Sequence, residues 1–241
     1  FELHADEIMS ALVLNQPVRE KLIDLPIGSS IFLPWINLWN KPFLFRQDKS
    51  VWSNNFGWFG FKDDRKSYFN GAAFHGSRVP ENLHMNKTEI DLPVLHFQFL
   101  NLNMERSKQA LYQIFERNHY PNKNIQQINK TYACAFDNRY INLIELDNFH
   151  YQAWLDYDID LNKIYDNDDV NWRDYEVLKN FDLYGISRYK DLNIWYIDWE
   201  LKRKKIGLEN SNLAITNVLD PRDLETKISH WYLMKYQKYP F

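Results

Sequence analysis

Hydrophobic and polar residues alternate most clearly in "DLPVLHFQFLN", residues 91–101. The side chains divide into two sets on opposite faces, Leu95, Phe97 and Phe99 on one and Val94, His96 and Gln98 on the other. A period of two residues predicts a β-strand. His96 would then lie on a strand shortly before a helix, and in α/β folds that edge of the sheet binds ligands.

The spacing becomes helical directly after this strand. Apolar residues recur at helical spacing over about 104–118, namely Met104, Leu111, Ile114 and Phe115. Asn103 stands where a capping residue is expected, since its side chain can accept a hydrogen bond from a free N–H of the first turn. This pattern predicts one long amphipathic helix.

The chain before residue 91 is less regular. Residues 5–24 have a helical pattern that is interrupted at Pro17, and "PIGSS" is then a turn. The bulky run "IFLPWINLW" predicts a strand that is bent or lies at a sheet edge because of Pro34. Short strands are expected at 57–62 and 72–75, within a loop-rich aromatic stretch.

From about residue 121 the pattern changes to short helical pieces rich in Trp and Tyr. The most regular are "WRDYEVLKNF" and "ISRYKDLNIWYIDWELKRKKIG". The basic run at 202–205 is expected to be a solvated helix face, with a binding role as the alternative. The chain is therefore predicted to be an α/β region over 1–120 followed by a helical, aromatic-rich region over 121–241.

Composition narrows the function classes. The net charge of -3 argues against general binding of nucleic acids or anionic membranes, which requires a basic surface. The single cysteine, Cys134, excludes an internal disulfide and a zinc site built from cysteines, and it fits a reducing compartment. No apolar run approaches the roughly 18 residues that span a bilayer. We therefore expect a cytoplasmic protein without a transmembrane segment.

Acidic and histidine residues are the candidates for chemistry. Asp6 and Glu7 offer the carboxylate oxygens that Mn²⁺ or Mg²⁺ prefers, or they mark the N-terminus of a helix. The adjacent Asp63 and Asp64 offer a general base or belong to a polar turn. The histidines of "FHGSRVP" and "VLHFQF" are either hydrogen-bonded core residues or ligands of a metal or phosphate.

Several stretches, taken in order, resemble bacterial family 2 glycosyltransferases. They are "LHADEIMSA", "LPIGSSIFLPWINLW", "FRQDKSVWSNNFGWFGFKDD", "FHGSRVP", "VLHFQFLNLNMERSKQALYQIFE" and "INKTYA", with "WRDYEVLKNF" and "DLNIWYIDWE" further on. The resemblance covers nearly the whole chain. It implies a GT-A fold, an α/β nucleotide-binding sheet, and inverting transfer of a sugar from a nucleotide-sugar to a glycan or another hydroxyl acceptor.

The resemblance also implies roles for individual residues. In such enzymes a D-x-D motif holds the metal, and here "HADE" stands in its place, with Asp6 at the second Asp and His4 replacing the first. The implied ligands of Mn²⁺ or Mg²⁺ are Asp6, His4 and His96, and the implied donor-binding residues are Glu7, His75 and Lys108. The implied catalytic base is Asp63 or Asp64. The implied acceptor-binding residues are Trp35, Trp52 and Trp58, although packing in the core would also explain each of these tryptophans.

Members of this family have strands before the motif. We therefore expect the chain to be the C-terminal portion of a longer enzyme, with residues 1–4 as the stub of the central strand. An incomplete sheet would expose an edge and favour self-association. The alternative to an enzyme is a catalytically inactive remnant that binds carbohydrate or acts as a scaffold. A nuclease is disfavoured, since no basic groove is evident.

Overall fold

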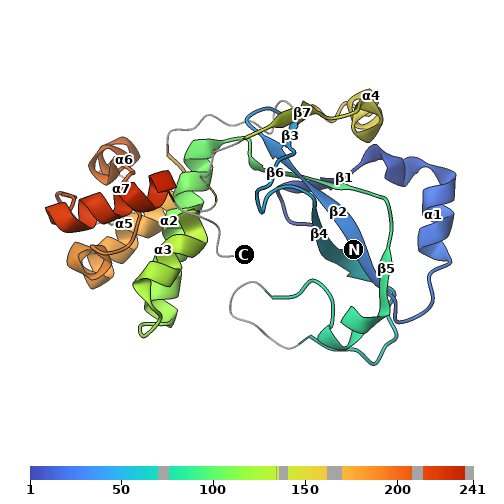
Figure 1. Ribbon diagram of the computed structural model, residues 1–241, viewed down its shortest axis with the longest axis horizontal. Coiled ribbons are helices and arrows are strands. Elements are labelled where there is room, and N and C mark those ends of the chain that lie inside the picture. Colours follow the sequence, from blue (N-terminus) through green and yellow to red (C-terminus); the bar gives the residue numbers. More distant parts are fainter. Residues whose placement is uncertain (70–75, 134, 136–140, 162–169, 208–213, 237–241) are drawn as a thin grey trace. The chain divides into compact units, whose positions relative to one another are not determined.

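The computed structural model describes residues 1–69, 76–133, 135, 141–161, 170–207 and 214–236 (Figure 1). It divides into a sheet unit, residues 1–100 and 140–165, and a helical unit, residues 101–139 and 166–241. This division differs from the predicted boundary after residue 120, because the helix that follows residue 101 groups with the later helices and the segment after 140 returns to the sheet.

The sheet unit is built around one long strand. Seven strands form a mixed sheet, so the chain belongs to the mixed α/β class. They are β1 (Glu7–Met9), β2 (Ser30–Trp39), β3 (Leu44–Arg46), β4 (Asn55–Phe61), β5 (Lys87–Glu89), β6 (Val94–Phe99) and β7 (Leu143–Glu145). Strands β5 and β6 pair with β2 in parallel, and β3 and β4 pair with β2 in antiparallel orientation. At the two ends of the strand order, β1 pairs with β6 and β7 pairs with β3, both in antiparallel orientation. Figure 1 shows β2 crossing the middle of this unit.

The prediction of a strand at "IFLPWINLW" is confirmed, but the strand is central and not at an edge. Its proline is tolerated because of where it lies. The pairs between β2 and β5 end at Phe32, and those between β2 and β6 begin at Trp35. Pro34 falls between them, where no residue pair joins β2 to either strand, so its missing N–H breaks no pair on that side.

The N-terminal helix was predicted too early. Residues Glu7–Met9 form β1, and the helix α1 runs only over Gln16–Ile23, after a 3₁₀ turn at Ala11–Leu14. The proline at position 17 lies in the first turn of this helix and does not interrupt it, because a missing N–H costs nothing there. Residues 1–4 belong to no strand, so their prediction as the stub of the central strand is wrong.

The strand predicted at 91–101 is confirmed as β6, but both of its faces are buried. Val94 packs in the core cluster with Ile31, Leu33 and Phe59, whereas Leu95 and Phe97 pack in a second cluster. The short strand predicted at 57–62 is confirmed as β4. The one predicted at 72–75 lies outside the described residues.

The helical unit packs around a single apolar cluster. Its described helices are α2 (Leu102–His119), α3 (Ile125–Ala133), α5 (Trp172–Tyr184), α6 (Trp199–Ile206) and α7 (Leu224–Tyr236). Buried residues from several of them form the core, for example Leu111, Ile128, Phe181 and Trp199. Only the last part of "ISRYKDLNIWYIDWELKRKKIG" is α-helical, as α6, since the first part is a 3₁₀ turn followed by bends.

The long amphipathic helix is confirmed as α2, with a different capping residue. The side chain of Asn101, not Asn103, accepts hydrogen bonds from the backbone N–H groups of Asn103 and Met104, both at 3.0 Å. The helix thus starts two residues earlier than predicted, because the residue at position 101 already has the extended backbone of a cap.

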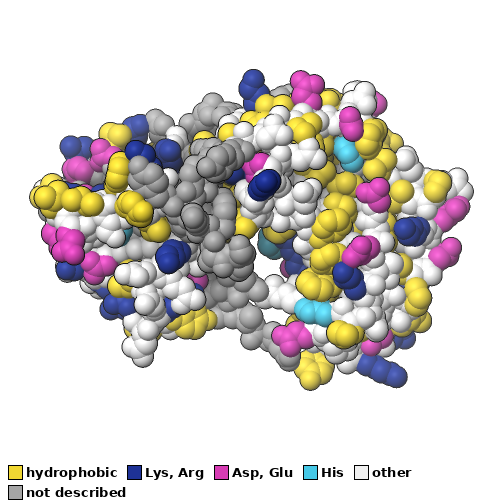
Figure 2. Space-filling view, viewed as in Figure 1, with side chains coloured by type: hydrophobic (Ala, Val, Ile, Leu, Met, Phe, Trp, Pro, Cys, Tyr) yellow, Lys and Arg dark blue, Asp and Glu magenta, His cyan; other side chains and the backbone are white. Residues whose placement is uncertain are grey.

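The helix at 172–184 is confirmed as α5 and begins with a capping box of Asn171 and Asp174. On the face seen in Figure 2, both units carry hydrophobic side chains interspersed with Lys, Arg, Asp and Glu. Within the described residues, no helix has both the length and the apolar character that crossing a membrane requires.

Candidate functional site

The pairing of β1 with β6 brings the acidic motif to a buried histidine. Glu7 is the register partner of His96, and the N–H of Phe97 donates to the carbonyl oxygen of Asp6 at 2.9 Å. These contacts join residues about ninety positions apart. Three of the predicted site residues, Asp6, Glu7 and His96, are therefore neighbours in the sheet unit.

Glu7 is held by an arginine that the sequence analysis did not select. Both carboxylate oxygens accept from the Arg78 guanidinium, at 2.8 and 2.9 Å. The Glu7 side chain is fully buried and that of Arg78 is 10% exposed. The guanidinium also lies over the rings of Phe59, at 4.6 Å, and Trp35, at 5.3 Å. The charge of the buried carboxylate is thus balanced by a protein cation.

His4 takes part in the same group. The Arg78 guanidinium, which can only donate, lies 3.0 Å from His4 Nδ1, so this nitrogen accepts and the neutral ring carries its proton on Nε2. The N–H of His4 also donates to Glu7 Oε2 at 2.8 Å. In this arrangement the lone pair of His4 Nδ1 is directed at the guanidinium.

His96 is held from the other side by an amide. Asn37 Nδ2 donates to the carbonyl oxygen of Trp52 at 3.0 Å, which turns Asn37 Oδ1 toward His96 Nδ1 at 2.8 Å. The imidazole must therefore donate from Nδ1, and its Nε2 faces the Asp6 carboxylate at 3.5 Å. The His96 side chain is 3% exposed and that of Asp6 is 37% exposed. The result is an accessible carboxylate backed by a fixed, buried imidazole.

The predicted metal ligands were tested against this geometry. Among the described residues, no group of three or more His, Cys, Asp and Glu side chains is arranged to hold a metal ion. Glu7 and His4 are both engaged by Arg78, and Asp6 is the accessible carboxylate of the motif. Mg²⁺ is commonly bound by one or two carboxylates together with substrate phosphates and water. The residues fit only that kind of site, with Asp6 as the protein ligand.

The two candidate bases are parts of a turn. Asp64 accepts from the N–H groups of Lys66, at 3.0 Å, and Ser67, at 2.8 Å, and also from the Ser67 hydroxyl. These hydrogen bonds, the one from Lys66 first, lower the pKa of Asp64, which makes it a weaker base. Asp63 is exposed and accepts from the Arg65 N–H at 2.8 Å. Both aspartates therefore fit the interpretation as a polar turn. Of the two side chains, that of Asp63 is the more accessible to solvent.

The three predicted acceptor tryptophans do not share one surface. Trp35 stacks on His96, with ring centroids 4.7 Å apart, and Trp52 reaches that histidine through Asn37. Trp58 belongs to a different group: it stacks on His84 at 4.3 Å and meets the ring of Phe32 edge-on at 4.9 Å. Trp39 is 1% exposed and belongs to the core.

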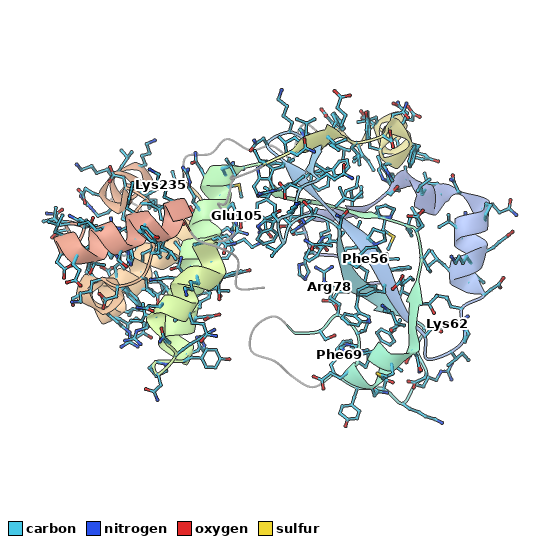
Figure 3. The ribbon with its side chains drawn as sticks, viewed as in Figure 1. Phe56, Lys62, Phe69, Arg78, Glu105 and Lys235 are labelled. Atoms are coloured by element: carbon cyan, nitrogen blue, oxygen red, sulfur yellow. The ribbon has the colours of Figure 1, made fainter. Side chains whose placement is uncertain are left out.

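The second group extends to a more exposed ring. Phe56, which is 49% exposed, stacks on Phe32 with centroids 5.6 Å apart. Phe56 and Arg78 are both labelled in Figure 3, beside the strands of the sheet unit. We call Phe32, Phe56, Trp58 and His84 the aromatic group of the sheet unit.

Two predicted donor residues do not join the site in the sheet unit. His75 lies outside the described residues. Lys108 is on α2 of the helical unit, with its Nζ 5.9 Å from the Tyr112 ring. The sequence analysis in turn missed Arg78 and Asn37. Asn37 had a usable signal, because it alternates with Trp35 on a predicted strand, whereas nothing in "FHGSRVP" indicates that its arginine meets Glu7.

Comparison with protein-family models, with curated proteins and with solved structures yields no match for this chain.

Proposed function

We propose that this chain is a glycosyltransferase that moves a sugar, with inversion, from a nucleotide-sugar donor to a hydroxyl acceptor such as a glycan. The sheet unit would belong to a GT-A-like domain. Since nucleotide-sugars are cytoplasmic substrates in such systems, the proposal includes a cytoplasmic location. It also retains self-association through a sheet edge, which sedimentation of the purified chain would test.

One observation carries the proposal: the accessible Asp6 carboxylate lies at the start of β1, 3.5 Å from a buried histidine. In the resemblance, this aspartate is the second acidic residue of the metal motif. The imidazole of His96 is fixed by Asn37 and fills the space behind the carboxylate. Because the Asp6 side chain is 37% exposed, a cation or a diphosphate-bound cation could reach its carboxylate.

The reaction assigns separate roles to the chain's residues. The acceptor oxygen attacks the anomeric carbon, the bond from that carbon to the diphosphate oxygen breaks, and the acceptor proton passes to a protein base. Mn²⁺ or Mg²⁺, when bound at Asp6, would supply charge neutralisation for the leaving diphosphate. Asp63 is the better of the two candidate bases because Asp64 is committed to its turn.

A second candidate function is carbohydrate binding without transfer. The aromatic group of the sheet unit supports it, because Phe56 is 49% exposed and stacks on Phe32 beside Trp58. Flat aromatic faces are the usual platforms for sugars. The ion pair of Arg78 with Glu7 and its hydrogen bond to His4 also remove two candidate ligands from metal chemistry.

The deciding experiment measures hydrolysis of UDP-, GDP- and dTDP-sugars with and without Mn²⁺. The proposal predicts Mn²⁺-dependent release of nucleoside diphosphate that is lost in Asp6→Asn and retained in Asp24→Asn, an exposed aspartate after α1. Thermal unfolding should show stabilisation by Mn²⁺ with UDP in the wild type but not in Asp6→Ala. Glycan binding that depends on Phe56 and Trp58, without any hydrolysis, would favour the second function instead.

The base is tested by a matched pair of variants. Asp63→Asn should lower turnover by about 100-fold or more, since Asn keeps the size but cannot take the proton. Asp64→Asn should be nearly silent, because an amide oxygen can still accept the N–H groups of Lys66 and Ser67. Equal activity in both variants would remove this pair from consideration.

A further inference from the structure

The helical unit contains a cavity that the proposed function does not use. It has a volume of about 440 Å³ and lies between the start of α2, the segment before α6, and α7. Polar and aromatic side chains line it, among them Arg106, Asn193, Tyr196, Arg222, Lys227 and Trp231. The volume is sufficient for a small organic molecule.

The described lining of this cavity is positively charged. Among the described residues that line it there is no aspartate or glutamate, whereas Arg106, Arg222 and Lys227 are cations. The nearby Asp220 pairs with Arg222 at 2.8 Å and lies 3.7 Å from Lys227. The single Asp220 carboxylate thus lies near two cations, Arg222 and Lys227. No ion pair of the Arg106 guanidinium occurs within the described residues.

The histidine beside these cations, His230, does not change the charge of the cavity lining. His230 Nδ1 accepts from the Arg222 guanidinium at 3.3 Å, and its Nε2 donates to the carbonyl oxygen of Asp191 at 3.0 Å. Burial lowers the pKa of His230, so the ring is neutral at pH 7. Arg222 also donates to the carbonyl oxygen of Trp195. Arg222 and His230 therefore form part of the cavity wall, and Arg106 and Lys227 are the cations that can bind a ligand.

A buried amide provides an independent indication of a ligand. Asn193 lines the cavity and is 2% exposed. Its backbone is satisfied, since its N–H donates to Asn129 at 2.8 Å and its carbonyl oxygen accepts from Gln113. Its side-chain amide, by contrast, has no hydrogen bond within the part of the chain that the structure describes. Because Asn193 lines the cavity, its amide group is available to a ligand there.

Two aromatic rings complete the lining. Trp231 is 56% exposed on α7, and the Tyr196 ring lies beside the start of α2, where its hydroxyl donates to the carbonyl oxygen of Arg106 at 3.5 Å. Aromatic side chains next to cations suit a ligand that has both a flat ring and a phosphate, because the ring stacks while the cations bind the anion.

We propose that this cavity binds a small phosphorylated molecule that bears a flat ring, such as a nucleoside monophosphate. Arg106 and Lys227 bind the phosphate, the Asn193 amide bonds to a polar edge, and Trp231 contacts the ring. The site is separate from the sugar-transfer site, since all of its lining residues belong to the helical unit.

The test is calorimetric titration of the full chain with UMP, uridine and inorganic phosphate, in EDTA so that no divalent cation contributes. UMP should bind, more weakly at high salt, and about tenfold more tightly than phosphate or uridine. Arg106→Gln should weaken UMP binding by about tenfold, and Asn193→Ala should weaken it by a similar factor. Trp231→Ala should reduce UMP affinity to that of phosphate.

Matched controls lie on α5, away from the cavity. Lys179→Gln removes a comparable surface cation, and Trp172→Ala removes a tryptophan that is 61% exposed. Both should bind UMP as the wild type does, and so should Asp6→Asn, which acts on the other unit. The proposal is overturned if no probe binds, if Arg106→Gln and Asn193→Ala both bind normally, or if phosphate binds as tightly as UMP.

Discussion

Polar side chains are paired differently at the candidate site of the sheet unit and at the cavity of the helical unit. In the sheet unit, the Glu7 carboxylate is matched by both arms of the Arg78 guanidinium, and His96 is matched by Asn37. In the helical unit, the cavity beside α7 has more cations than carboxylates and contains a buried amide without a described partner. The sheet unit is thus internally compensated around its candidate site, whereas the helical unit leaves donors for a ligand.

The difference shows that polar residues alone do not reveal a binding site. The "HADE" motif is the more suggestive sequence, yet two of its side chains are already satisfied by Arg78. When the polar side chains of a cluster already bond to one another, only those that solvent can still reach are available to a ligand. In the sheet unit this side chain is Asp6. A cavity lined by several cations and an amide without a side-chain hydrogen bond is the stronger structural indication of an occupant, because these groups can bind a ligand directly. The predictions below test this contrast in both units.

The largest effect is expected from Arg78→Met in the sheet unit. This change leaves the Glu7 carboxylate buried without its cation, which should reduce the free energy of unfolding by about 3–5 kcal/mol. Urea unfolding followed by tryptophan fluorescence measures the loss. The double variant Glu7→Gln, Arg78→Met should recover most of it, since no buried charge remains.

The matched control for this prediction is Lys87→Met. Lys87 pairs with Glu89 at 2.7 Å, but both side chains are at least 40% exposed. Such a surface pair is worth up to about 1 kcal/mol. If Arg78→Met costs no more than this control, Glu7 is not compensated as described.

A smaller effect is expected from Asp174→Ala in the helical unit. Asp174 is fully buried, closes the capping box of α5, and accepts from Lys202 Nζ at 3.0 Å and from the Ser107 hydroxyl at 2.5 Å. Losing the cap and these bonds should cost about 3 kcal/mol. Hydrogen exchange should show faster opening of α2, α5 and α6, with the strands of the sheet unit unchanged.

Glu176→Ala on the same helix is the control for Asp174. Its carboxylate is partly exposed and lies 3.5 Å from Lys179, so its loss should cost less than about 0.5 kcal/mol. Equal loss of protection in both units after Asp174→Ala would mean that they unfold as one, and the comparison between them would fail.

The smallest effect concerns two histidines, the half-buried His150 of the sheet unit and the buried His230 of the helical unit. Burial lowers the pKa of His150 in the sheet unit and of His230 in the helical unit below the ordinary value of 6.5. Each takes up a proton less readily when folded, so the unfolded state binds more protons as the pH falls below 6.5. Stability should therefore decrease from about pH 6.5 down through the folded pKa of each histidine.

Single substitutions separate the two contributions. His150→Gln and His230→Gln should each reduce the pH dependence of urea unfolding between pH 7 and 5. An unaltered pH profile in both variants would show that other groups cause the acid sensitivity.

Local pattern was sufficient for the strongest elements. The alternation at 94–99 and the bulky run at 30–39 identified β6 and β2, and helical spacing identified α2 and α5. The errors lie where local signals have two meanings. Pro34 is typical of an edge strand but falls between two pairing partners, and residues 7–9 fit a helix but pair with β6.

By itself the sequence determined the order of the main elements, the acidic motif and the histidine of β6, because periodicity and residue chemistry are local. Only the tertiary structure decided the partners. Glu7 and Arg78 are 71 residues apart and Asn37 and His96 are 59 apart, and each pair depends on strand register and chain return. A period of two fixes which face a side chain occupies, but not which distant side chain meets it there. For this reason the accessible Asp6 and the cationic cavity with Asn193 became visible only in the folded chain.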